Sequence, residues 1–243
     1  DSGTTWTGVR IDDVIDSLGD GRRFDPSVAY DANGNVYVAY GFVNAAGTRR
    51  AVVVARSLDD GATFLATDIK VIDNQVNPST VTQEQFYLAT GIDNSVLPAR
   101  ESVYVGWTEL TAGVPTRVRV AGSPSSDSTG ALPLVFSTAD VSATGRPRMG
   151  DVTVGPNGEL YATWTDYGST PERVVVASDP NGLQGGMIFG AAAQVTVSHL
   201  GYRRIIPAQA QRGISAGPNI DVDRSGGPFR GRMYVTYSEL GDG

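Results

Sequence analysis

The chain has 243 residues, of which 40% are hydrophobic and 19% charged, and a formal net charge of −7. This composition excludes whole-chain disorder, and the acidic balance argues against a nucleic-acid partner, because such binding needs clustered lysine and arginine. No cysteine is present for disulfides or thiolate metal sites, and no apolar run is long enough for membrane insertion. The length fits one all-β domain, and 30 glycines with 13 prolines indicate many turns.

A turn pattern stands at the start of the chain and returns later. Ser57-Leu-Asp-Asp-Gly-Ala-Thr-Phe64 is repeated in shortened form as Asp1-Ser-Gly-Thr-Thr-Trp6. In such a turn Asp accepts amide hydrogen bonds, Gly takes a positive φ, Thr adds a local bond and the aromatic ring packs on the layer beneath. The expected structural residues are Asp1, Gly3 and Trp6 in the first copy and Ser57, Asp59, Gly61, Thr63 and Phe64 in the second.

A strand motif repeats four times along the chain. An apolar residue, Tyr, two small or branched residues and an aromatic residue recur every 57 to 73 positions, around Tyr37, Tyr104, Tyr161 and Tyr234. Each copy follows another β-rich run that ends in a turn signal such as Asn-Gly, which is typical of a hairpin. A third and a fourth strand follow three of the copies, so the repeat unit is a four-stranded antiparallel blade.

The sequence therefore predicts an all-β fold, a β-propeller of four-stranded antiparallel blades. The expected division of 1–243, as one propeller domain or a fragment of one, is a strand over 7–15, blades at about 24–73, 85–142 and 148–198, and a partial blade over 215–243. These amount to about four blades' worth of strands, and the span from Val197 to Ser215 is expected to be an irregular insert. Because the first turn has no strand before Asp1, we expect the remainder of a longer polypeptide, with a closed four-bladed ring as the alternative.

The repeated turn and the Tyr-x-x-aromatic strands resemble the sialidase superfamily, whose bacterial-neuraminidase (BNR) repeats contain the same Asp-box turn. The resemblance implies a larger six-bladed propeller, a secreted bacterial protein at the cell surface or outside the cell, and a site on the face opposite the Asp-boxes. Sialidases hold their acidic sugar with three arginines and use a tyrosine nucleophile with acidic partners. The family's Arg-Ile-Pro signature is altered here to Arg204-Ile-Ile-Pro207, and no tyrosine matches the nucleophile.

Two sets of residues occupy repeated places on that opposite face. Glu109, Asp166 and Glu239 follow the Tyr strands at one offset and are the catalytic acid–base candidates, while Arg23, Arg148 and Arg212 precede the blades and could bind a carboxylate. Gln85 stands near the corresponding place in the remaining blade. The alternative is scaffolding, in which repeated acids satisfy loop amides and pair with repeated arginines.

Three functions remain open from the sequence. The first is an extracellular module that binds a carbohydrate or an extracellular protein without turnover; the second is a glycoside hydrolase of sialidase type; the third is a structural repeat unit of a large surface protein. Ca²⁺ is a possible cofactor because carboxylates such as Asp221 and Asp223 lie near turns, although no complete loop of spaced ligands is present.

Overall fold

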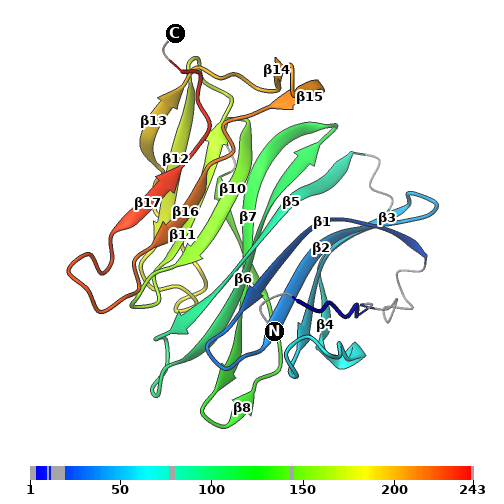
Figure 1. Ribbon diagram of the computed structural model, residues 1–243, viewed down its shortest axis with the longest axis vertical. Helices are drawn as coiled ribbons and strands as arrows, with labels where there is room; N and C mark the ends of the chain where they lie inside the picture. Colours follow the sequence, from blue (N-terminus) through cyan, green and yellow to red (C-terminus); the bar gives the residue numbers. More distant parts are fainter. Residues whose placement is uncertain (1–3, 10, 12–19, 77–79, 143–144, 242–243) are drawn as a thin grey trace.

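The computed structural model describes residues 4–9, 11, 20–76, 80–142 and 145–241, and these form antiparallel sheets with one short 3-10 turn, Ala66–Asp68 (Figure 1). No helix among the described residues is long and apolar enough to cross a membrane.

Three sheets of four or five strands follow one another along the chain. The first contains β1 (Gly21–Tyr30), β2 (Val36–Asn44), β3 (Arg49–Ser57) and β4 (Ile69–Val76), hydrogen-bonded in that order. The second contains β5 (Val81–Asp93), β6 (Arg100–Thr111) and β7 (Val114–Asp127), with β8 (Gly130–Ala131) and β9 (Ser137–Ser142) both pairing with β7. The third contains β10 (Pro147–Val154), β11 (Leu160–Asp166), β12 (Glu172–Asp179) and β13 (Ala193–Ser198).

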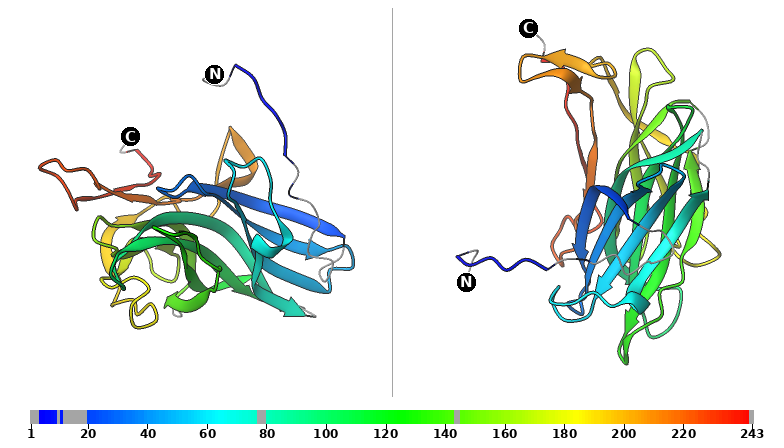
Figure 2. Two further views of the ribbon diagram at one scale, coloured as in Figure 1. Left: turned by 90° about the horizontal axis from the view of Figure 1, so that it is seen from below. Right: turned by 90° about the vertical axis from the view of Figure 1, so that its right-hand side faces the viewer.

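Two hairpins complete the described chain. They are β14 (Arg204–Ile206) with β15 (Gln209–Ile214), and β16 (Asn219–Val222) with β17 (Met233–Thr236). Figure 2 shows the three sheets side by side as a curved fan, with β16–β17 next to the third sheet and the β14–β15 hairpin projecting from the body. The expected fold class, an all-β propeller with four-stranded antiparallel blades, is confirmed.

The structure differs from the expected elements in three places. Residues 197–215 contain the β14–β15 hairpin, where an irregular insert was expected, because Pro207 and Ala208 make a short turn that pairs Ile206 with Gln209. The last strand of the first sheet does not follow the Ser57–Phe64 turn directly but begins at Ile69, since the 3-10 turn intervenes. Of the strand expected over 7–15, only 7–9 and 11 are described, and they are not in a strand.

Two of the three hydrophobic core clusters lie between sheets, and the third lies on the first sheet. Between the first and second sheets, Tyr37 and Val54 pack with Phe86, Val105 and Trp107. Between the second and third, the main members are Tyr104, Val120, Met149, Leu160 and Trp164. Tyr37 and Tyr104, two of the four repeated tyrosines, are buried between sheets, whereas Tyr161 is half-buried and Tyr234 is exposed. The repeated tyrosine therefore corresponds to packing between blades in the first two units.

The first strands of successive units, β1, β5, β10 and β16, contact one another and form the inner layer. Three of them are bulged at corresponding places, between Phe24 and Ser27, between Glu84 and Tyr87, and between Met149 and Asp151. A bulge leaves residues unpaired in the ladder and re-aims their side chains. The positive φ of Asp25 (49°) and Gln85 (61°) belongs to two of these bulges.

The Ser57–Phe64 turn is held by its own side chains. Asp59 accepts hydrogen bonds from the Thr63 amide at 2.8 Å and the Thr63 hydroxyl at 2.7 Å, and Ser57 Oγ accepts one from the Gly61 amide at 2.9 Å. The Ser57 hydroxyl also donates to Asp59 at 2.6 Å, and this bond, followed by those from Thr63, lowers the pKa of Asp59. Gly61 has a φ of 86°, and Phe64 packs against the core of the first sheet.

The shortened copy of this turn is different. Asp1 and Gly3 lie outside the described residues. Trp6, which the pattern expected to pack on a layer beneath, is instead 88% exposed. The reason is that residues 4–9 form no strand and so do not join a sheet that could receive the ring.

Candidate functional site

Two of the three expected arginines meet at one end of the inner strands. Arg148 on β10 and Arg212 on β15 both line two adjoining pockets, of about 350 Å³ and 230 Å³. Gln85 of the β5 bulge lines both pockets as well. The larger pocket is also lined by Asp25, Glu84 and Tyr87, and the smaller one by Tyr202 and Arg203. We call these two spaces together the arginine pocket.

Arg148 is the fixed centre of the arginine pocket. Its Nε donates to Gln85 Oε1 at 3.1 Å, its Nη2 lies 3.2 Å from Glu84 Oε2, and its Nη1 donates to the Tyr202 hydroxyl. The guanidinium also lies 5.2 Å from the centre of the Tyr202 ring. Gln85 is held in turn by the Thr108 hydroxyl at 3.1 Å. All three nitrogens of Arg148 are thus engaged, and its role is to position the pocket wall.

Arg203 and Arg212 are the available cations. Arg203 precedes β14 and Arg212 lies on β15, so one hairpin presents both to the smaller pocket. Within the described part of the chain, neither guanidinium makes a hydrogen bond or ion pair, although Arg203 lies 5.2 Å from the centre of the Tyr202 ring. An exposed guanidinium fork at a pocket can bind a carboxylate through two parallel hydrogen bonds.

The third expected arginine lies elsewhere. Arg23 on β1 lies 5.7 Å from the centre of the Phe42 ring and does not line either part of the arginine pocket. Burial raises the pKa of the Tyr40 phenol, and the positive charge of Arg23 partly offsets this rise. Of the expected clamp, the structure therefore brings together Arg148 and Arg212 but not Arg23.

The expected acid–base residues are engaged in local structure. Glu109, 7% exposed at the end of β6, lies 3.5 Å from Arg117 and 3.5 Å from Arg119. Arg119 also pairs with Asp140 at 2.9 Å and with Asp73 at 3.6 Å. Glu109 is therefore one member of a network between the first two sheets.

Asp166 and Glu239 bind backbone amides. Asp166 accepts from the Gly168 and Arg146 amides and from Arg173, at 2.8, 3.2 and 2.9 Å. Burial raises the pKa of Asp166, but these bonds outweigh it and the net pKa is lowered. Glu239 accepts from the His199 and Leu240 amides, and its pKa is lowered in the same way against burial. Neither residue, nor Glu109, lines the arginine pocket.

A different carboxyl faces a cavity of about 440 Å³ beside the arginine pocket. Asp151 on β10 lines it, together with residues of β1, β5, β16 and β17. Burial raises the pKa of Asp151 to about 6, against the amide bonds from Val152 and Ile220, and the nearby Asp221 adds to the rise. Burial, followed by the charges of Asp151 and Asp25, also raises the pKa of Tyr87, which lines the larger part of the arginine pocket.

The described residues contain no group of three or more carboxylate or imidazole side chains that could hold a metal ion. The carboxylates considered for Ca²⁺ are used otherwise: Asp223 caps its own turn through the Ser225 amide at 2.7 Å, and Asp221 pairs with Arg224 at 3.2 Å.

Two pocket residues, Tyr202 and Arg203, were missed by the sequence reasoning, because they lie outside the repeat. The signal that could have found them is the local cluster Tyr202-Arg-Arg204 followed by Arg212, an arginine-rich stretch in an acidic chain.

Comparisons with known proteins concern the fold. Neither the protein-family models nor the curated proteins include a match to the sequence. Among solved structures, the chain is similar to an α-L-arabinanase of Penicillium chrysogenum complexed with arabinobiose, with a TM-score of 0.51 and 13% identity. The match covers 88% of this chain, which spans 58% of the length of the arabinanase chain. At this identity the likeness shows the fold alone, a β-propeller, and the sialidase type stays a proposal.

Proposed function

We propose that this propeller binds carbohydrate through the carboxylate of an acidic sugar in the arginine pocket. The observation that carries the proposal is the pair Arg203 and Arg212, two guanidiniums without ion-pair partners in the described chain, placed at a polar pocket beside the fixed Arg148. The extracellular or cell-surface location expected from the sialidase resemblance belongs to this proposal.

Carbohydrate as the ligand class has two supports. The similar arabinanase was solved with arabinobiose, so a propeller of this kind can hold a sugar. The pocket itself offers the amide of Gln85, the hydroxyl of Tyr202 and guanidinium donors. Sugars bind through such directed polar groups.

The test is isothermal titration calorimetry with methyl glucuronide and N-acetylneuraminic acid, and with methyl glucoside as the uncharged comparison. We expect the acidic sugars to bind and the glucoside to bind far more weakly. Arg212→Ala should reduce the affinity for the acidic sugars about tenfold to a hundredfold, since it removes a charge-assisted bond.

Arg22→Ala is the matched control for this variant. Arg22 is an exposed arginine on β1 that does not line the pocket, so it changes the net charge equally and should leave binding unchanged. Equal binding of glucoside and glucuronide, or equal effects of the two variants, would contradict the proposal.

A second candidate, glycoside hydrolysis, is favoured by Asp151. A glycosidase needs a carboxylic acid that stays protonated near neutral pH, and the pKa of Asp151 is raised to about 6. Fluorogenic sialoside, glucuronide and arabinofuranoside substrates test this candidate. Turnover that disappears in Asp151→Asn while glucuronide binding persists would support hydrolysis, and no turnover of any substrate would leave the protein a binding module.

A further inference from the structure

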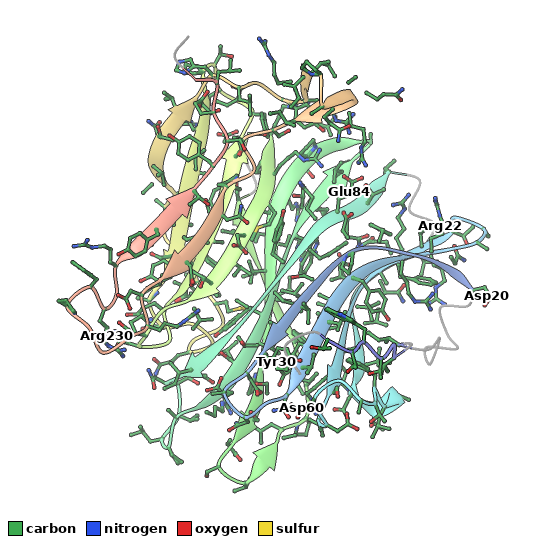
Figure 3. All side chains as sticks on the ribbon, in the orientation of Figure 1. Asp20, Arg22, Tyr30, Asp60, Glu84 and Arg230 are labelled. Carbon is green, nitrogen blue, oxygen red and sulfur yellow. The ribbon has the colours of Figure 1, made fainter. Side chains whose placement is uncertain are left out.

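Three hollows follow one another along the inner strand β5. The larger part of the arginine pocket is lined by residues 84–87, the 440 Å³ cavity by residues 88–90, and a third hollow of about 390 Å³ by residues 90–92. We call this succession the β5 trough. Figure 3 shows its direction: Glu84 lies toward the upper end of the sheets, and Tyr30 and Arg230, which line the third hollow, lie toward the lower end.

The backbone amides that a strand-like ligand would need are already bonded. Asp25 accepts from the Gln85 amide at 3.0 Å and Ser27 from the Leu88 amide at 3.1 Å. Further along the inner layer, Asp151 accepts from the Ile220 amide at 3.3 Å. Each side chain comes from the preceding unit and bonds an amide of the next, so these amides are not free to pair with an extended peptide.

The polar side chains that line the trough are suited to binding sugar hydroxyls. The 440 Å³ cavity is lined by the carboxylates of Asp151 and Asp221, the amide of Asn219 and the half-exposed ring of Tyr234. Carboxylate and amide groups hydrogen-bond hydroxyls, and an aromatic ring packs on the apolar face of a sugar. Arg224 lines the same cavity and pairs with Asp221 at 3.2 Å, so this part of the trough carries little net charge and fits a neutral unit.

We propose that the ligand is a linear oligosaccharide that lies along the β5 trough, with its acidic unit in the arginine pocket and neutral units beside Tyr234. This inference rests on the proposed function and adds to it the length, the direction and the charge order of the ligand. A single acidic sugar would fill only the first hollow, whereas each further unit enters the next one.

The test compares glucuronic acid, cellobiouronic acid and cellotriouronic acid by calorimetry on the intact chain. We expect the affinity to rise about tenfold from the monosaccharide to the trisaccharide, as each unit buries further surface in the trough. Tyr234→Ala should remove this rise and leave the affinity for glucuronic acid within about twofold of the unmodified chain, since Tyr234 is absent from the arginine pocket.

Tyr237→Ala is the matched control, because Tyr237 is 39% exposed against 49% for Tyr234 and does not line the 440 Å³ cavity. Equal affinity for the three saccharides would overturn the inference, and so would a rise that survives Tyr234→Ala. A rise shown instead by acid-terminated peptides of increasing length would replace the saccharide with a peptide. No binding of glucuronic acid together with none of the longer saccharides would defeat the proposed function itself.

Discussion

Two arginine-rich regions of this molecule look alike in sequence and behave differently in space. Between the first two sheets, Arg117 and Arg119 contact three carboxylates, those of Glu109, Asp73 and Asp140. At the end of the inner strands, Arg203 and Arg212 face a pocket without such partners in the described chain. The difference shows that repeated charge does not by itself make a binding site. A site needs charge that the fold leaves unsatisfied beside open space.

Removing a cation from the ion-pair network between the first two sheets should have the largest effect on stability. Arg119→Ala leaves the largely buried Glu109 and Asp73 without this cation, and we expect a loss of about 3 kcal/mol in the free energy of unfolding. Urea denaturation measures the loss, and calorimetry should show glucuronide binding unchanged. Arg22→Ala, at an exposed position, should change stability by less than about 0.5 kcal/mol. Loss of glucuronide binding in Arg119→Ala with unchanged stability would show that the Arg119 network serves binding and not stability.

Asp151 gives a smaller effect that depends on pH. Its pKa is about 6 in the folded chain against 3.8 for the free side chain, so the folded state holds the proton more tightly. Its contribution to stability is therefore present below pH 3.8, decreases as the pH rises toward 6, and is absent above that.

Asp151→Asn removes this dependence. At pH 7 the variant should be more stable than the unmodified chain by about 1 kcal/mol, after allowance for partial exposure of the carboxyl. The difference between the two proteins should shrink toward zero or reverse near pH 4. Urea denaturation at several pH values measures both curves, and parallel curves would show that Asp151 does not titrate in this range.

The sequence predicts the blades well because a single physical pattern repeats. The tyrosines at 37 and 104 are buried between sheets, and the Asn-Gly turn after Asp31 joins two strands of the first sheet. The hairpin β14–β15 could not be found in this way, since the stretch from Gln209 to Arg212 is short and polar and has no apolar alternation.

The candidate site was predicted only in part. The offset from the repeated tyrosine places Glu109, Asp166 and Glu239 near strand ends, but it says nothing of which amides or cations each carboxylate meets. Those partners, such as the Gly168 amide and Arg119, come from loops and neighbouring strands. Arg148 and Arg212 converge because a bulged inner strand and a hairpin outside the repeat happen to meet, which no periodicity encodes.

The bulges of the inner strands allow specificity to change without loss of the scaffold. Gln85 stands outside the ladder register, so the paired residues on either side keep the sheets in place whatever side chain it presents, whereas the Asp25 carboxylate accepts a hydrogen bond from the Gln85 amide of the next unit. Gln85 contributes to both parts of the arginine pocket, while Phe86 beside it packs in the core between sheets. Position 85 is therefore a place where ligand preference could be re-engineered by substitution, using residues that tolerate a left-handed backbone, such as Asn and Gly.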